Sequence, residues 1–122
     1  MPKIIVIDDE QPICDLIRHL MEPEGYVVKT ESDPTKAVQL VREESPDCVV
    51  LDVKMPKIDG IDVLDGINAL GKNTKVIIVT GYGNIENAME SMKLGAYDYI
   101  TKPFDLGFLK NLIKQCVMEK KK

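Results

Sequence analysis

The sequence has few cysteines and histidines, no excess of positive charge and no long hydrophobic run. Its three cysteines, Cys14, Cys48 and Cys116, are far apart and odd in number. They therefore indicate small buried hydrophobic residues in a reducing compartment rather than a disulfide framework. No apolar run approaches the roughly 20 residues of a membrane-spanning helix, and the start of the sequence is unlike a signal peptide. We expect a cytoplasmic protein without a membrane segment.

The charge balance is slightly acidic, with 16 lysines and arginines against 20 aspartates and glutamates and a formal net charge of −4. A surface for nucleic acid or anionic lipid needs clustered basic residues, and the one basic run is residues 120–122. The 122 residues, 44% of them hydrophobic, suffice for one domain with its own core. We expect a single domain over residues 1–122 that does not itself bind nucleic acid.

Strand-like and helix-like segments alternate five times. Short apolar runs rich in β-branched residues or tyrosine predict strands at residues 4–7, 26–28, 48–51, 76–79 and 97–100. Apolar residues at helical spacing predict helices at residues 13–21, 34–41, 61–67, 85–92 and 105–117. Strands that are apolar throughout are buried on both faces, as in a parallel sheet. The predicted fold is α/β, a doubly wound five-stranded parallel sheet with five helices.

Acidic residues follow two of the predicted strands. Asp8, Asp9 and Glu10 come directly after the first strand, and Asp52 follows the third. Acids at these positions are also typical of an ordinary helix start, where they favour the helix dipole. Ligands of such sheets bind at the carboxyl edge, where neighbouring strands lie about 5 Å apart. If the acids converge there, their mutual repulsion favours a bound cation, and Mg²⁺ suits carboxylate oxygens best.

A hydroxyl and a lysine follow the other two strands of interest. Thr80 ends the fourth strand, and Lys102 comes shortly after the fifth. Taken singly, such a threonine is usually structural and such a lysine usually lies on the surface. Together with the acids, they can align and neutralise a phosphoryl group during its transfer to a carboxylate. This chemistry needs no histidine base, and we expect the only histidine, His19, to lie on the surface of the first helix.

The sequence resembles the receiver domains of bacterial two-component response regulators, the CheY-like group within the flavodoxin-like folds. The resemblance covers nearly the whole chain. It is carried by Asp8-Asp9, the loop 52–60, Thr80-Gly81 and residues 101–104. Residues 80–84 and 95–106 look most like receivers of the nitrogen-regulation type, which precede an ATPase and a DNA-binding domain in activators of sigma-54 promoters.

The resemblance implies roles for individual residues. Asp52 would accept a phosphoryl group from a sensor histidine kinase. Magnesium would be held by Asp9 and Asp52, by Asp8 mainly through water, and by the backbone carbonyl of Lys54. The domain would catalyse its own phosphorylation and dephosphorylation without any further enzyme activity.

Other implied roles concern the phosphoryl group and the signal. Thr80 and Lys102 would hold phosphoryl oxygens, and the peptide bond between Lys102 and Pro103 would be cis. Thr80 and Tyr99 would form the switch; the less favoured alternative is that Tyr99 is an ordinary strand tyrosine with an exposed hydroxyl. Residues Lys54 and Tyr82 occupy the positions that control dephosphorylation in the family, and their bulk favours a longer-lived phosphoryl group.

The resemblance also implies partners and leaves alternatives. The face formed by the fourth helix, fifth strand and fifth helix, roughly residues 84–117, would change on phosphorylation and pair two domains. A linker to an output domain would begin near residue 118.

A stand-alone receiver, acting in a phosphorelay or on a target protein, is the serious alternative. A haloacid-dehalogenase-like phosphatase lacks its general acid here, because Lys54 stands two places after Asp52, and Asp8-Asp9-Glu10 would repel the phosphate of a flavodoxin cofactor.

Overall fold

Short runs of β-branched residues form the central sheet, as the sequence predicts. The computed structural model describes residues 1–55, 58–71, 73–81 and 85–119. Its main sheet has five parallel strands in the order β2-β1-β3-β6-β7. The strands are β1 (Lys3–Ile7), β2 (Val27–Glu31), β3 (Cys48–Asp52), β6 (Lys75–Thr80) and β7 (Asp98–Thr101). The strand order reverses between β1 and β3, which confirms the doubly wound prediction.

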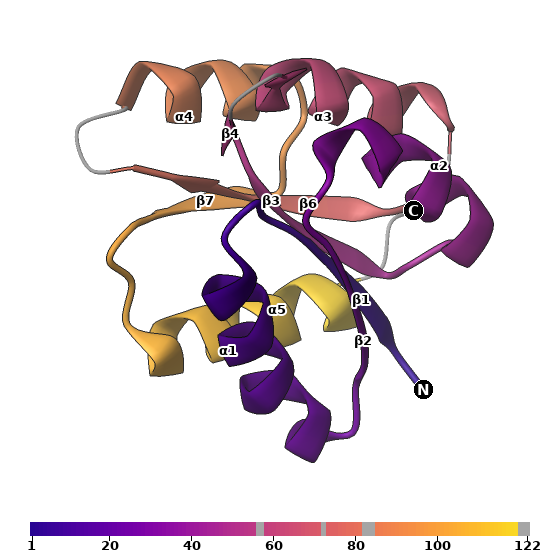
Figure 1. The fold of residues 1–122 in the computed structure, drawn as a ribbon, viewed down its shortest axis with the longest axis vertical. Helices are drawn as coiled ribbons and strands as arrows, with labels where there is room; N and C mark the ends of the chain where they lie inside the picture. The colour runs from indigo at the N-terminus through magenta and orange to yellow at the C-terminus, as the bar shows by residue number, and fades with distance from the viewer. Residues whose placement is uncertain (56–57, 72, 82–84, 120–122) are drawn as a thin grey trace.

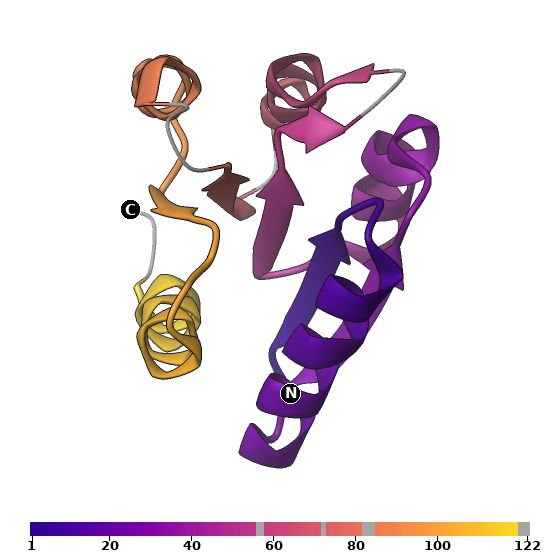
Figure 2. The same ribbon diagram turned by 60° about the vertical axis from the view of Figure 1, so that its left-hand side comes forward.

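Helices cover both faces of this sheet (Figure 1). They are α1 (Gln11–Met21), α2 (Ala37–Glu44), α3 (Gly60–Ala69), α4 (Ile85–Lys93) and α5 (Leu106–Met118). Helices α1 and α5 lie on one face and α2, α3 and α4 on the other, as the turned view also shows (Figure 2). Short 3-10 turns, Glu22–Glu24 and Pro34–Lys36, follow α1 and precede α2. Within the described ranges, no helix is long and apolar enough to cross a bilayer.

Two apolar layers make up the core, one on each side of the sheet. Ile4 and Val6 face the layer shared with α1 and α5. Ile5 and Ile7, the alternate residues of the same strand, face the layer shared with α2 and α3. Successive strand residues point to opposite faces, so a strand buried on both sides must be apolar throughout. The uniform apolar runs in the sequence are the consequence.

Two strand predictions need correction. The second strand runs from Val27 to Glu31 rather than over residues 26–28, because an edge strand tolerates polar residues such as Lys29 that end an apolar run. A small antiparallel pair, β4 (Lys54–Met55) and β5 (Ile58–Asp59), was not predicted. Two-residue strands are too short to show an apolar pattern.

Caps confirm the predicted helix starts in α5 and before α2. The Asp105 side chain accepts a hydrogen bond from the Phe108 amide at 2.9 Å, at the beginning of α5. The Asp33 side chain accepts one from the Thr35 amide at 3.0 Å, before Pro34. Such carboxylates satisfy backbone N–H groups that have no partner within the helix.

Candidate functional site

The register of the sheet places the predicted site residues at one edge. Ile7 of β1 pairs with Leu51 of β3, so Asp8 and Asp52 follow neighbouring strand positions. Asp52 in turn pairs with Val79 of β6, the residue before Thr80. Asp8 is 2% exposed and Asp52 is 3% exposed. Two carboxylates are therefore buried side by side, an arrangement that needs a nearby positive charge.

Lys102 supplies that charge. Its ammonium Nζ lies 3.1 Å from Asp8 Oδ2, 3.1 Å from Asp52 Oδ2 and 2.9 Å from Glu10 Oε1. The backbone fixes the base of this side chain: the Lys102 amide donates a 2.7 Å hydrogen bond to the Thr80 carbonyl. The Lys102–Pro103 peptide bond is cis. The loop after β7 thus carries Lys102 back over the ends of β1 and β3.

The pKa values reflect this crowding. Burial raises the pKa of the Asp8 carboxyl to about 6; the charge of Asp52 adds to the rise, while hydrogen bonds from the Glu10 amide and Lys102 oppose it. Burial alone would lower the pKa of Lys102, but its contacts with Glu10, Asp8 and Asp52 outweigh burial and raise it above its usual value. The lysine therefore stays charged, and Asp8 binds a proton more readily than an ordinary aspartate.

The acids form one cluster of oxygen donors. Asp8, Asp9, Glu10 and Asp52 each place a carboxylate oxygen within 4.8 Å of the others. A set of carboxylate oxygens suits a hard divalent cation such as Mg²⁺, so the residues present fit the predicted metal. Lys54 begins β4; only its backbone belongs to the described part of the chain.

Thr80 contributes a buried hydroxyl. Its side chain is 0% exposed, and its Oγ1 has no hydrogen-bond partner among the described residues. Leaving a buried hydroxyl unpaired costs about 1–3 kcal/mol, and such groups concentrate where a ligand satisfies them. This hydroxyl belongs to the last residue of β6, the strand next to Asp52, and is a second, independent sign of a ligand at this edge.

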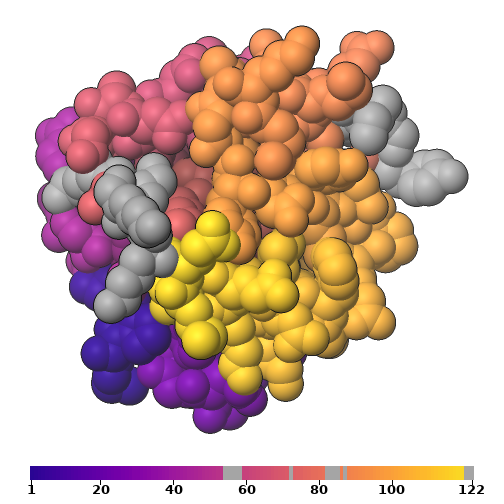
Figure 3. Space-filling view, turned by 180° about the vertical axis from the view of Figure 1, so that it is seen from behind, coloured from indigo at the N-terminus to yellow at the C-terminus, as the bar shows by residue number. Residues whose placement is uncertain are grey.

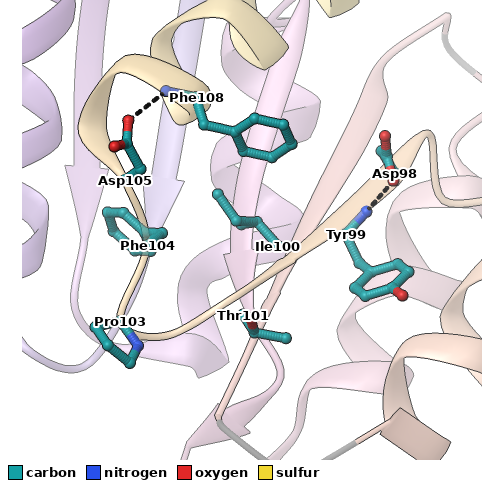
Figure 4. Close-up of a pocket in the computed structure, with 8 residues that line it drawn as sticks. All are labelled: Asp98, Tyr99, Ile100, Thr101, Pro103, Phe104, Asp105 and Phe108. Carbon is teal, nitrogen blue, oxygen red and sulfur yellow. Dashed lines mark hydrogen bonds between the residues drawn. The ribbon is translucent and has the colours of Figure 1, made fainter.

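The predicted switch tyrosine lies on the neighbouring face. Tyr99 of β7 is half-buried against the core layer of α2 and α3. It lines an open hollow of ≈ 410 Å³ together with residues 103–105 of the loop after β7 and Phe108 in the first turn of α5. Figure 4 shows its ring on one side of β7 and the rings of Phe104 and Phe108 on the other. Tyr82, the predicted dephosphorylation-rate residue, lies outside the described residues.

Helices α4 and α5 expose four large apolar side chains, Met89 (57% exposed), Met92 (40%), Leu106 (37%) and Phe108 (57%). Phe108 also lines the hollow. In the space-filling view the orange and yellow segments that include α4, β7 and α5 form one continuous face (Figure 3). Exposed apolar patches of this kind commonly mark protein interaction sites.

Sequence reasoning missed one participant in the site. Glu10 was noted as the third acid after β1 but was given no role, and it makes the shortest of the three contacts with Lys102. These two residues are 92 positions apart in the sequence. No local pattern could have paired them. His19, as expected, is exposed on α1.

Comparison with known proteins gives a consistent picture. The sequence matches the response regulator receiver domain model over residues 4–114. It is 35% identical over 113 residues to the sporulation initiation phosphotransferase F of Bacillus subtilis (strain 168), covering 93% of this chain and 91% of that protein. It is 33% identical over 117 residues to the regulatory protein AtoC of Escherichia coli (strain K12), covering 96% of this chain but only 25% of that protein. The receiver domain of NtrX from Brucella abortus superposes with a TM-score of 0.89 at 32% identity, covering 96% of this chain and 99% of that one.

Proposed function

The chain belongs to the response regulator receiver domain family, and on this premise we propose that Asp52 accepts a phosphoryl group from a phosphohistidine of a sensor histidine kinase. The observation that carries the proposal is the position of Lys102, whose ammonium lies 3.1 Å from the carboxylate of Asp52. A carboxylate that is buried, fixed and paired with a cation at the carboxyl edge of such a sheet is placed where ligands bind.

The transfer asks the protein for alignment and charge neutralisation. An Asp52 carboxylate oxygen attacks the phosphorus, the P–O bond forms, and the P–N bond to histidine breaks as the imidazole leaves. Lys102 and the Thr80 hydroxyl donate hydrogen bonds to phosphoryl oxygens, which gives a partner to a buried hydroxyl that has none among the residues the structure describes. In hydrolysis a water oxygen attacks the phosphorus of the aspartyl phosphate and the P–O bond to Asp52 breaks. Inorganic phosphate leaves, and the Asp52 carboxylate is restored.

The acid cluster is proposed to hold Mg²⁺. Asp9 and Asp52 would coordinate it directly, Asp8 through water, and Lys54 through its backbone carbonyl. Bound there, the cation supplies positive charge that offsets the carboxylates and the incoming phosphoryl oxygens.

The first prediction tests the acceptor. With Mg²⁺ and a small acyl or amido phosphate donor, the domain should gain one base-labile phosphoryl group, and Asp52→Asn should gain none. Intact-protein mass spectrometry reads the result. The matched control is Asp65→Asn, which alters an exposed aspartate on α3 and should label normally. Unchanged labelling of the Asp52→Asn variant contradicts the proposal.

Phosphorylation is proposed to act through the face of α4, β7 and α5. Thr80 moves toward the phosphoryl group and Tyr99 turns into the space that it leaves, which alters a face that already exposes apolar side chains. In a protein of the AtoC or NtrX kind, this face would pair two receivers and control a transcriptional output domain. We place such a protein in the cytoplasm, in keeping with three cysteines that are buried and free.

A second candidate function rests on a different observation. The phosphotransferase of Bacillus subtilis is matched over 91% of its length, so a receiver of this size can be a whole protein. This chain would then pass the phosphoryl group to another protein or bind a target directly. Transfer of the phosphoryl group from this chain to a histidine of a second protein can be measured in a purified mixture. Such transfer distinguishes a phosphorelay role from control of an output domain.

A further inference from the structure

Glu10 stands at the helix start but does not act as a cap. It is the N-cap residue of α1, and its carbonyl accepts hydrogen bonds from the Ile13 and Cys14 amides at 3.0 and 3.3 Å. Its side chain makes no capping hydrogen bond within the part of the chain that the structure describes. Carboxylates at this position usually accept from the amides of the first turn. Here the carboxylate reaches across to Lys102 Nζ instead, at 2.9 Å.

This contact completes the hydrogen bonding of the lysine. An ammonium has three N–H donors, and Lys102 contacts three carboxylates, those of Asp8, Glu10 and Asp52. A phosphoryl group on Asp52 can therefore gain further hydrogen bonds from the ammonium only if Asp8 or Glu10 gives way. Asp8 and Asp52 are buried, whereas the Glu10 side chain is 59% exposed. Glu10 can swing into water at the least cost.

We propose that Glu10 is a positioning residue that holds Lys102 in the unphosphorylated site and competes with the phosphoryl group for it. The inference rests on the proposed function, because it assumes an anion beside Asp52. The carboxylate opposes that anion in two ways: it occupies an N–H donor of Lys102, and its negative charge repels the phosphoryl oxygens. The same charge attracts a cation to the acid cluster. Removal of Glu10 therefore shifts anion affinity and cation affinity in opposite directions.

The test measures both affinities in the whole chain by calorimetric titration. Mg²⁺ alone is the cation probe, and beryllofluoride at saturating Mg²⁺ is the phosphoryl probe. In Glu10→Gln, we expect beryllofluoride to bind about two- to fivefold tighter and Mg²⁺ about two- to fivefold weaker, the range expected for a partly exposed ion pair. Glu43→Gln removes an exposed acid on α2 and should change neither value.

A shorter acidic side chain at position 10 separates the effect of the contact with Lys102 from the effect of the negative charge. Glu10→Asp keeps the negative charge, but an aspartate at this position is placed to cap α1 and release Lys102. We expect it to bind beryllofluoride more tightly than the unsubstituted protein and Mg²⁺ with unchanged affinity. A purely structural role would move both affinities in the same direction or neither.

The outcomes distinguish a failure of the proposed function from a failure of the competition between Glu10 and the phosphoryl group. If the unsubstituted protein does not bind beryllofluoride, or binds it equally well with Asp52→Asn, the proposed function fails. If binding depends on Asp52 while Glu10→Gln leaves both affinities unchanged, only the competition is wrong. If Glu10→Asp binds beryllofluoride like the unsubstituted protein, the ion pair has no role, and that result also overturns the inference.

Discussion

At the scale of single residues, the site holds polar groups in surroundings that are unfavourable without a ligand. The Thr80 hydroxyl is buried and has no hydrogen-bond partner within the described ranges, and the Asp8 carboxyl is buried beside Asp52 with a raised pKa. Groups like these cost stability, and proteins keep them where function needs them. Their removal should therefore stabilise the protein while weakening ligand binding.

Thr80→Val tests whether the hydroxyl lowers the stability of the protein and strengthens ligand binding. Valine has nearly the shape of threonine but no hydroxyl, so the free energy of unfolding without ligand should stay the same or rise by about 1 kcal/mol. Beryllofluoride should bind about 10- to 100-fold more weakly, because a hydrogen bond to a charged group is lost. Urea unfolding and calorimetric titration measure the two quantities. Thr80→Ser, which keeps the hydroxyl, should retain most of the affinity. A loss of stability with unchanged affinity would contradict the assigned role.

The raised pKa of Asp8 predicts a pH dependence. In the folded protein the pKa is about 6, above the usual 3.8, so the folded state binds the proton more tightly than the unfolded state. The free energy of unfolding should then increase as the pH falls through about 6 toward about 4, in the absence of divalent cations.

The matched measurement compares three proteins by urea unfolding across this pH range. Asp8→Asn cannot take up the proton and should lose the increase, whereas Asp65→Asn, on the surface of α3, should keep it. If Asp8→Asn shows the same pH dependence as the unsubstituted protein, another group is responsible.

At the scale of elements, close backbone contact fixes the loop that leaves the site. Val53 follows Asp52, and its carbonyl accepts a 3.3 Å hydrogen bond from the amide of Gly60, the first residue of α3. A Cβ atom at Gly60 would lie only 2.2 Å from Val53 Cα. Helix α3 therefore begins directly against Val53, the residue after the proposed phosphoacceptor Asp52, and only glycine permits this approach.

A pair of glycine substitutions in α3 tests the contact. Gly60→Ala should lower the free energy of unfolding by about 1–3 kcal/mol, the usual cost of overpacking, because the backbone of Val53 cannot move aside freely. In Gly66→Ala the new methyl meets a methyl carbon of Val38 at 2.8 Å. That side chain can turn, so the cost should be smaller. Urea unfolding measures both variants. If Gly60→Ala and Gly66→Ala lower the free energy of unfolding equally, the close backbone contact at Gly60 carries no special cost.

At the scale of the whole molecule, the candidate site and the hollow beside α5 lie on adjoining parts of the fold. The loop after β7 carries both Lys102 of the site and Phe104 of the hollow, and β7 carries Tyr99 between the two. The loop after β7 thus links the candidate site at Asp52 to the hollow lined by β7 and α5.

Pairing of two domains should depend on the face of α4, β7 and α5. We expect beryllofluoride with Mg²⁺ to promote dimerisation and Phe108→Ser to prevent it, because Phe108 exposes 57% of its surface beside the hollow. Leu16→Ser removes an exposed apolar side chain from α1 and should leave pairing unchanged. Sedimentation velocity measures the association state. Dimers of Phe108→Ser under the same conditions would place the interface elsewhere.

The fold and most of the candidate site could be predicted from the sequence. Uniform apolar strands and helical spacing indicated the alternation of elements, and Asp8, Asp52 and Thr80 lie at or directly after the ends of strands. The pair β4 and β5 escaped prediction because two-residue strands carry no periodic signal. The β2 boundary was wrong because an edge strand accepts polar residues.

What the sequence by itself determined was the order of the elements and the kinds of side chain that follow each strand, because burial on both faces leaves a local apolar pattern. The tertiary structure alone decided which of those side chains meet. Strand order brings β1 between β2 and β3, and the loop after β7 returns Lys102 to Asp8, Asp52 and Glu10. The contact between Glu10 and Lys102 spans 92 positions, and only the packing of the whole sheet creates it.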